Sequence, residues 1–214
     1  MYACLRCRPD ALYMATFLTT KCKNPTTTDL KTAYHVASYL VGTPHLGLLF
    51  DADCTESDDA FADAAFAPYH DAYSHTGGMY KTCGAPTVFM SKKQSILAKS
   101  SCSAEIVAAD ALTERVIALT DVYMEIGMSF KDPVPLHQDN QAAITICKPC
   151  SASKITRRPR AMRLRISALQ TAQGNKHIRM VDTRTEHMQA DGLTKPLRGA
   201  AFERFVDWTV KPPF

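Results

Sequence analysis

Apolar residues recur with the 3.6-residue spacing of a buried helix face between Ser101 and Gly127, the strongest periodic pattern in the chain. Extending this stripe backwards by two turns reaches Glu105. The pattern therefore predicts a long helix whose buried face carries a carboxylate. Because an isolated buried carboxylate is costly, we expect Glu105 to face a cation or a hydrogen-bonding partner. The apolar positions of the stripe are Leu112, Val116, Leu119, Tyr123 and Ile126.

Shorter segments have the composition of β-strands. His45 to Asp53 is apolar on both faces and ends in acids, which is typical of a buried central strand with a functional end. Thr55 to Tyr73 is acidic and Ala-rich and predicts a loop or an irregular insertion. The remaining predicted strands are 77–81, 85–90, 133–138 and 177–182, with a turn at Cys83-Gly84 between the first two of these.

Helical patterns fill most of the remaining chain. Strand–helix–strand connections imply parallel pairing for the later strands, whereas the early pair can be antiparallel. The order of elements predicts a mixed α/β sheet preceded by a helical pair. The other predicted helices cover 9–20, 28–40, 139–147, the basic stretch to about 172, 187–194 and 200–208.

Composition limits the class of protein. The chain of 214 residues is 46% hydrophobic with 9 Gly and 12 Pro, which argues against a collagenous or wholly disordered protein. It has no apolar run of 18 residues and no secretory signal at its start, so we expect no membrane span and an intracellular protein, cytoplasmic or nuclear. The net charge of +4 permits a polyanionic partner without demonstrating one.

Eight cysteines offer one alternative. Cys4-x-x-Cys7 and Cys147-x-x-Cys150 together supply the four thiolates of a zinc site, which would make the chain a zinc-stabilised interaction protein. The gap between the two pairs is far longer than a zinc ribbon uses, and Cys147 falls on an apolar helical pattern. Free, partly buried thiols are the preferred interpretation.

Four acids are candidates for chemistry: Asp51, Glu105, Asp139 and Asp191. If the strands that end in Asp51 and Asp139 are parallel neighbours, their axes lie about 4.8 Å apart and the two carboxylates meet at one sheet edge. Clustered carboxylates cannot all ionise unaided, and two Mg²⁺ ions would stabilise them and support phosphoryl displacement. Each acid taken alone can equally be solvated, and Asp139 is well placed to cap the helix after it.

Several strings resemble, in order and spacing, the reverse transcriptase tail and ribonuclease H domain of copia-type LTR retrotransposon Pol polyproteins. They are Cys7-Arg8-Pro9-Asp10, Tyr39-Leu40-Val41-Gly42-Thr43 with Gly47-Leu48-Leu49, Asp51-Ala52-Asp53 for the family's "DAD", Ser91-Lys92-Lys93-Gln94, Ser100-Ser101-Cys102-Ser103-Ala104-Glu105, Asp139-Asn140-Gln141-Ala142-Ala143-Ile144, and Ala190-Asp191-Gly192-Leu193-Thr194-Lys195-Pro196-Leu197.

The resemblance implies a ribonuclease H-like mixed five-stranded sheet flanked by helices, with an N-terminal helical appendage. It implies that Asp51, Glu105, Asp139 and Asp191 are catalytic and hold two Mg²⁺ ions, with Mn²⁺ as a substitute. The implied reaction is endonucleolytic hydrolysis of the RNA strand of an RNA–DNA hybrid, with the Pol polyprotein and its reverse transcriptase as the partner context. Recognition of RNA would rest on 2′-hydroxyl contacts in the minor groove.

The resemblance also suggests domain limits: 1–44 as the end of the reverse transcriptase, 45–198 as the ribonuclease H-like domain and 199–214 as a C-terminal helix and tail. The chain departs from the family in having Cys54 where Trp usually follows "DAD". It lacks an aromatic-x-Asp-Asp motif, so no polymerase activity is implied. The alternative is a catalytically inactive Pol fragment that keeps the fold as a nucleic-acid-binding or inert module.

Further residues have weaker cases. Asp53 can act as an outer group beside Asp51 or be a solvated edge acid. His187 can assist product release or be a surface residue. The arginine run from Arg157 to Arg165 can hold phosphates or form a solvated helix face. By resemblance alone, Ser91, Lys92 and Lys93 would touch the backbone of the hybrid.

Overall fold

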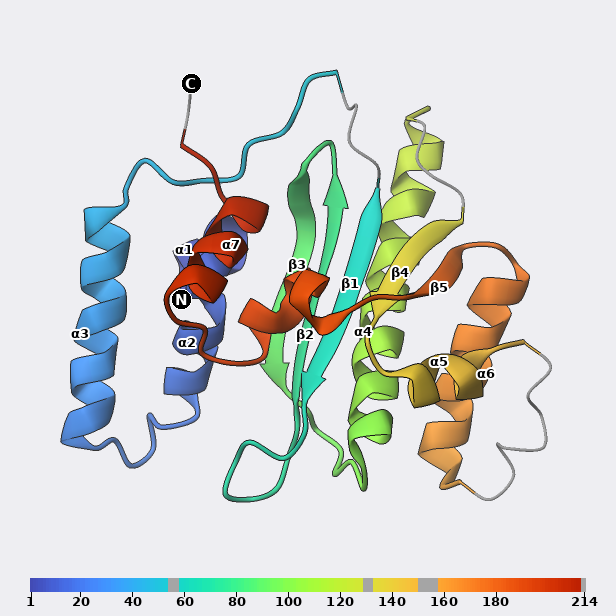
Figure 1. Cartoon of the computed structure of the whole chain (residues 1–214), viewed down its shortest axis with the longest axis horizontal. Helices are drawn as coiled ribbons and strands as arrows, with labels where there is room; N and C mark the ends of the chain where they lie inside the picture. Colours follow the sequence, from blue (N-terminus) through green and yellow to red (C-terminus); the bar gives the residue numbers. More distant parts are fainter. Residues whose placement is uncertain (54–57, 129–132, 150–157, 213–214) are drawn as a thin grey trace.

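One mixed sheet forms the centre of the molecule in the computed structural model, which describes residues 1–53, 58–128, 133–149 and 158–212 (Figure 1). Its five strands follow the order β3-β2-β1-β4-β5. β1, β2 and β3 pair antiparallel, whereas β4 runs parallel to β1 and β5 parallel to β4. The predicted mixed five-stranded sheet is confirmed. The strands are β1 (Asp59–Ala65), β2 (His75–Thr82), β3 (Ala85–Lys93), β4 (Val134–Gln138) and β5 (Ile178–Asp182).

The central strand is not the one that the sequence predicted. His45 to Asp53 contains no strand, and only Gly47 forms a bridge, to Lys211. β1 instead lies in the Ala-rich stretch that predicted a loop. Ala60 and Ala62 are fully buried beneath the long helix α4 (Ser101–Glu125), so their small side chains allow helix and sheet to approach closely.

Helices α4, α5 (Gln141–Cys147) and α6 (Arg160–Gly174) cover one face of the sheet (Figure 1). α4 begins after Ser100, whose hydroxyl accepts a hydrogen bond from the backbone N–H of Ser103 as an N-cap. Leu112 and Val116 of the predicted apolar stripe are fully buried in this core, and Glu105 is on the same buried face. The prediction is wrong for Ile126, which lies just past the end of α4 and is 63% exposed. The core of this layer includes Leu112, Val116, Leu136, Ile166 and Leu169.

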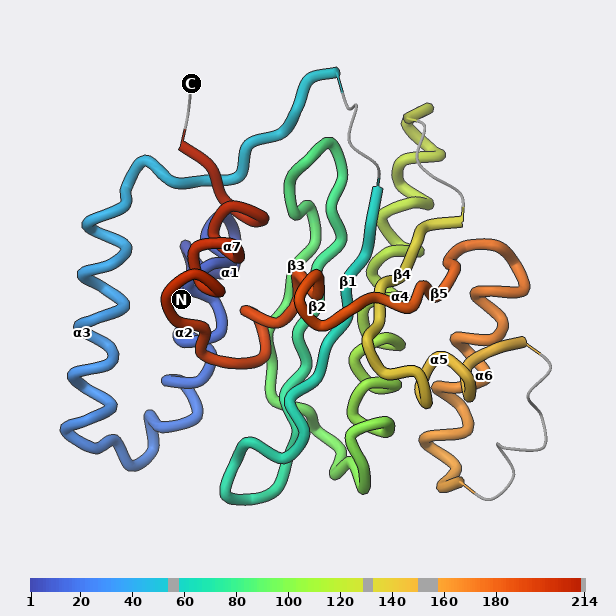
Figure 2. The backbone as a smooth tube through the Cα atoms, in the orientation of Figure 1, coloured from blue at the N-terminus to red at the C-terminus, as the bar shows by residue number. Residues whose placement is uncertain are grey.

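The opposite face is covered by elements from both ends of the chain (Figures 1 and 2). Its core joins Leu12, Phe61, Met79, Leu193 and Phe205. The N-terminal helical appendage is thus confirmed, and it packs beside the C-terminal helix on the sheet. The elements of this layer are α1 (Tyr2–Arg6), η1 (Pro9–Ala11), α2 (Leu12–Thr19), η3 (Thr185–His187), η4 (Gln189–Leu193) and α7 (Ala200–Thr209).

Helix α3 (Thr27–Gly42) stands at the edge of this layer (Figure 2), and none of its residues is buried. Its C-terminal end is held by a group of residues that we call the Arg8 clasp. Arg8 forms a buried ion pair with Asp10 at 2.7 Å and donates to the backbone oxygen and the hydroxyl of Thr43, both at 2.8 Å. The hydroxyl of Tyr39 donates to Asp10 at 2.7 Å. The clasp therefore ties the end of α3 to η1.

The alternative of a zinc site shared by the two Cys-x-x-Cys pairs is wrong. Cys4 lies in the core that contains Phe61, and Cys147 lies in the core on the opposite face of the sheet, so the two pairs cannot share an ion. Cys4, Cys7, Cys22, Cys102 and Cys147 are free thiols. Cys83 is disulfide-bonded, so the preference for free thiols is wrong at that position. Cys54 and Cys150 lie outside the described residues.

Within the described ranges, none of the helices has both the length and the apolar character needed to cross a membrane.

Candidate metal centre

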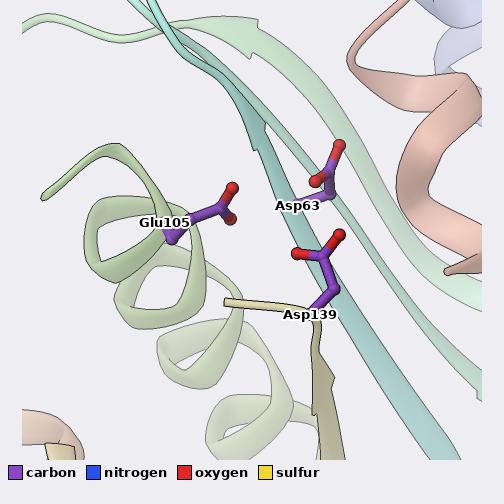
Figure 3. A group of neighbouring side chains, drawn as sticks. All are labelled: Asp63, Glu105 and Asp139. Carbon is purple, nitrogen blue, oxygen red and sulfur yellow. The ribbon is translucent and has the colours of Figure 1, made fainter. Parts of the chain in front are cut away.

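Three carboxylates meet at the end of the sheet where β1 and β4 finish (Figure 3). Ala60 pairs with Leu136 and Phe61 with His137 in the parallel ladder, and two further residues along each strand bring Asp63 beside Asp139. Glu105 reaches the same point from α4. One oxygen from each of the three carboxylates lies within 4.8 Å of the other two. This is the kind of oxygen cluster that hard divalent cations bind.

Asp63 is almost completely buried, as is Glu105. Its residue is 6% exposed, and the hydroxyl of Thr194 donates a hydrogen bond to Oδ2. Burial, together with the charges of Asp191 and Asp139, raises the pKa of Asp63 to about 6 against the opposing effects of Thr194 and Lys195. A cation at this point would relieve both the burial and the repulsion.

Glu105 is placed by the periodicity of α4, which puts it on the face toward the sheet. It is 5% exposed, and its Oε2 accepts a hydrogen bond of 3.2 Å from the amide of Gln138. Burial raises the pKa of Glu105 to about 9, with the charges of Asp63 and Asp139 acting in the same direction. The expectation that Glu105 needs a partner is confirmed, because Gln138 supplies a donor.

Asp139 is free of the capping role that its position predicted. The N-cap of α5 is Asn140, whose Oδ1 accepts from the backbone N–H of Ala143 at 3.0 Å. The carboxylate of Asp139 instead lies toward Asp63 and Glu105 (Figure 3). It accepts a hydrogen bond of 3.0 Å from the hydroxyl of Thr185. The capping interpretation is therefore wrong.

Asp191 lies on η4, close enough to Asp63 for its charge to raise the pKa of that carboxyl. Lys195 forms an ion pair with Asp191 at 2.8 Å. The second oxygen of Asp191, Oδ1, is buried and has no hydrogen-bond partner in the part of the chain that the structure describes. Burial is the main cause that raises the pKa of Asp191. An oxygen left in this state fits a cation ligand, since unpaired buried oxygens are costly.

Two glycines set the position of η4. A Cβ on Gly77 of β2 would lie 2.5 Å from Thr194 and 2.9 Å from Leu193, so the segment can lie directly on the strand only because this side chain is absent. A Cβ on Gly192 would lie 2.4 Å from the ring of Phe205 in α7. Asp191 is thus held against the sheet on one side and by the C-terminal helix on the other.

Asp51 is not part of this group, and the predicted convergence is wrong for this residue. Its backbone N–H donates to the oxygen of Cys83 at 2.8 Å, in the turn between β2 and β3. That turn lies beside the start of β1, where Asp59 pairs with Lys81, whereas Asp63 pairs with Gly77 at the other end of the strand. Asp53 is exposed, and its backbone N–H donates to the carboxylate of Asp51 at 3.0 Å.

Asp63 is the residue that the sequence reasoning missed, although a signal was present. Asp63-Ala64-Ala65-Phe66 keeps the first Asp and the Ala of the family's "DAD" string, with an aromatic residue where the family usually has Trp. The exact string at Asp51-Ala52-Asp53 concealed this weaker match. Requiring the Asp to lie in a strand that pairs with the strand before Asp139 would have selected Asp63.

The minor candidates divide between surface and interior. Ser91 is buried and donates to the backbone oxygen of Leu193 at 2.7 Å, so its predicted contact with a hybrid is wrong. Lys93 pairs with Asp71. His187 is exposed on η3, two residues after the Thr185 that binds Asp139.

The arginine run faces two environments. Arg165 pairs with Asp110 and joins α6 to α4, whereas Arg160 and Arg163 are exposed. Arg157 lies outside the described residues.

Comparison with known proteins identifies relatives over nearly the whole chain. It is 28% identical over 201 residues to the retrovirus-related Pol polyprotein from transposon RE1 of Arabidopsis thaliana, covering 93% of this chain and 13% of the relative. It is 28% identical over 200 residues to the corresponding polyprotein from transposon RE2 of the same plant, covering 92% and 14%. The chain therefore spans about a seventh of the length of these curated relatives.

Among solved structures, the chain is similar to LC11-RNase H1, isolated from compost by a metagenomic approach. The TM-score is 0.46 at 13% sequence identity, over 64% of this chain and 92% of that one. No protein-family model matches the chain. The sheet order and the parallel attachment of β4 and β5 give the mixed five-stranded sheet that the sequence strings implied.

Proposed function

We propose that this chain is the ribonuclease H of a retrovirus-related Pol polyprotein, because it is homologous over 93% and 92% of its length to those of transposons RE1 and RE2. The proposed reaction is endonucleolytic hydrolysis of the RNA strand of an RNA–DNA hybrid with Mg²⁺, leaving a 3′-hydroxyl and a 5′-phosphate. The Pol context and a neighbouring reverse transcriptase are part of the proposal, as are the domain limits 1–44, 45–198 and 199–214.

One observation carries the proposal: the grouping of Asp63, Glu105 and Asp139 with their oxygens within 4.8 Å. These residues lie 34 or more positions apart in the sequence, and a buried group of like charges is costly unless a cation neutralises it. The raised pKa values of Asp63 and Glu105, and the oxygen of Asp191 that has no hydrogen-bond partner among the described residues, support the same interpretation, because each feature is relieved by a bound cation.

The residues fit a pair of Mg²⁺ ions. Glu105 and Asp139 would hold one ion with Asp63, and Asp191 would join Asp63 at the second. When bound, such ions polarise a phosphodiester and activate a water for in-line displacement. Thr194 fixes one oxygen of Asp63, and Thr185 fixes one oxygen of Asp139, so the chain holds both carboxylates in place. Selection of RNA would use 2′-hydroxyl contacts in the minor groove.

The test uses the purified chain, an RNA–DNA hybrid labelled at the 5′ end of the RNA, and Mg²⁺. Asp139→Asn should lower cleavage by about 1000-fold, since it removes one charged metal ligand worth several kcal/mol. The matched control is Asp182→Asn. Asp182 ends the neighbouring strand β5, is exposed and pairs with Gln141, so its loss should leave cleavage unchanged.

The same assay on the unmutated chain decides between an active ribonuclease and the alternative of a catalytically inactive Pol fragment. Cleavage of the RNA strand only, dependent on Mg²⁺, supports the ribonuclease. Hybrid binding that weakens with salt but yields no cleavage would favour a Pol fragment that retains only the fold.

A further inference from the structure

Gln138 connects two of the three clustered carboxylates. It is the last residue of β4 and is fully buried, directly before Asp139. Its Oε1 accepts from the backbone N–H of Asp139 at 2.9 Å and from that of Asn140 at 3.1 Å. Its Nε2 donates to Oε2 of Glu105 at 3.2 Å. One side chain therefore spans from the β4–α5 turn to α4.

The orientation of this amide follows from its partners. Two backbone N–H groups can be satisfied only by the carbonyl oxygen, so the NH₂ group must point the other way, toward Glu105. A swap of the two ends would place a donor against two donors and an oxygen against a carboxylate oxygen. Gln138 is thereby restricted to donating to Glu105.

This contact limits the freedom of Glu105. A glutamate has three rotatable side-chain bonds, and fixing them costs conformational entropy when a ligand binds. The buried amide of Gln138, which donates to Oε2 of Glu105, restricts these bonds before any cation binds. Because the same amide holds the N–H of Asp139, the positions of the two ligands are fixed relative to each other. Outer partners of this kind commonly change metal affinity by about 10- to 100-fold.

We propose that Gln138 is a positioning residue that acts through Glu105, holding its carboxylate in place beside Asp139 for divalent-cation binding. This inference rests on the proposed function, because it assumes that these acids are metal ligands. Gln138 itself contacts neither the cation nor the substrate. Its contribution is therefore expected in metal affinity and must disappear when Glu105 can no longer bind a cation.

The experiment measures Mn²⁺ binding to the whole chain by calorimetry. Gln138→Met keeps the length of the side chain and removes both the donor and the acceptor. We expect its Kd for Mn²⁺ to rise by about 10-fold or more. The matched control is Gln141→Met, which removes an amide that donates at 3.0 Å to an exposed carboxylate, that of Asp182, and should leave the Kd unchanged.

A second variant, Gln138→Asn, keeps the proposal testable if Gln138→Met does not fold. Gln138→Asn keeps an amide that can accept from the turn but is one methylene shorter, so it cannot reach Glu105 as well. Its Kd should rise as in Gln138→Met. A folded Gln138→Asn or Gln138→Met protein with the Kd of the parent overturns the proposal.

A double-mutant cycle separates positioning from general stability. In a Glu105→Gln background, Gln138→Met should change the Kd by less than about 2-fold, because the ligand through which Gln138 acts is already lost. An equal loss of affinity in both backgrounds would show a merely structural role for the turn and overturn the proposal.

The cycle also keeps the two proposals distinct. A parent chain that binds no Mn²⁺ overturns both. A parent that binds Mn²⁺ and cleaves the hybrid, with unchanged binding in the Gln138 variants, overturns this inference and leaves the ribonuclease in place.

Discussion

The Arg8 clasp and the carboxylate group at the ends of β1 and β4 are two buried assemblies of charge with opposite balance. In the clasp, Arg8 faces Asp10, and Tyr39 and Thr43 complete the hydrogen bonds of both. The sheet end gathers four acids: Asp63, Glu105, Asp139 and Asp191. Among the described residues, the cation beside them is Lys195, which forms an ion pair with Asp191. The clasp is complete with its own side chains, whereas the acid group has an excess of negative charge.

This difference separates architecture from function. A buried ion pair with satisfied hydrogen bonds holds one arrangement of the chain, here the end of α3 against η1. A buried group of like charges lowers stability and persists only where something else depends on it. The two regions should therefore respond in opposite ways to substitution, pH and divalent cations.

The largest effect is expected from Asp63→Asn. It should lower hybrid cleavage by about 1000-fold, since Asp63 is grouped with Glu105 and Asp139 and is also within the electrostatic reach of Asp191. Asp51→Asn, the matched change at the residue that the sequence favoured, should keep the parent rate. Rates measured under single-turnover conditions decide the matter, and a loss confined to Asp51→Asn would reject the site described above.

A substitution in the Arg8 clasp should lower the free energy of unfolding of the chain and not act through the cleavage site. Arg8→Met leaves Asp10 buried without its cation, and breaking such a pair costs about 3–5 kcal/mol. Denaturant unfolding should show this loss with and without Mg²⁺. Arg6→Met removes an exposed arginine two residues earlier and should cost little. A loss that Mg²⁺ restores would contradict the separation of the two regions.

The pH dependence of stability without metal should come from the acid group. The pKa of Glu105 is raised from 4.5 to about 9 by burial, so its protonated form is favoured in the folded chain. The folded state then binds more protons than the unfolded state, and stability falls as the pH rises from about 4.5 toward 9. In EDTA, the melting temperature should therefore drop by about 5 °C or more between pH 5 and pH 8.

Glu105→Gln should remove most of this slope, because the amide stays neutral. Glu114→Gln, an exposed change on the same helix, should keep it. Added Mg²⁺ should stabilise the parent most at the high end of the range. A slope that persists unchanged in Glu105→Gln would assign the pH dependence elsewhere.

The smallest effect is expected from Lys195→Met. The ammonium of Lys195 lies 2.8 Å from Asp191 and competes with a divalent cation for it. Its removal should tighten Mn²⁺ binding by about 3-fold to 10-fold, equivalent to roughly 1 kcal/mol. Lys92→Met, at an exposed position of β3, serves as the control. Weaker binding by Lys195→Met would mean that the lysine holds Asp191 in its binding position.

The sequence predicted most elements where pattern and burial agree. The stripe on α4 placed Glu105 correctly, and the strands β4 and β5 were predicted within one residue. In these segments, local spacing reports the face that the finished fold buries. Asp139 was also found, since it follows a clear strand directly.

The failure at β1 has a physical reason. Asp59–Ala65 is rich in Ala and Asp, which have low strand propensity, and only its pairing with β2 and β4 makes it the central strand. His45 to Asp53 has the better strand composition, but almost no partner in the sheet. Propensity within a window cannot register a ladder formed with residues far along the chain, so Asp51 was chosen and Asp63 was missed.

The absence of a side chain at Gly192 has a consequence for synthesis on the ribosome. The ring of Phe205 occupies the space that a Cβ would need, so the turn bearing Asp191 gains its support on this side only when α7 has emerged. A nascent polypeptide arrested before Ala200 would carry all four acids yet lack the wall that seats the last of them. The order of translation thereby leaves the packing around Asp191 incomplete until α7 has been made.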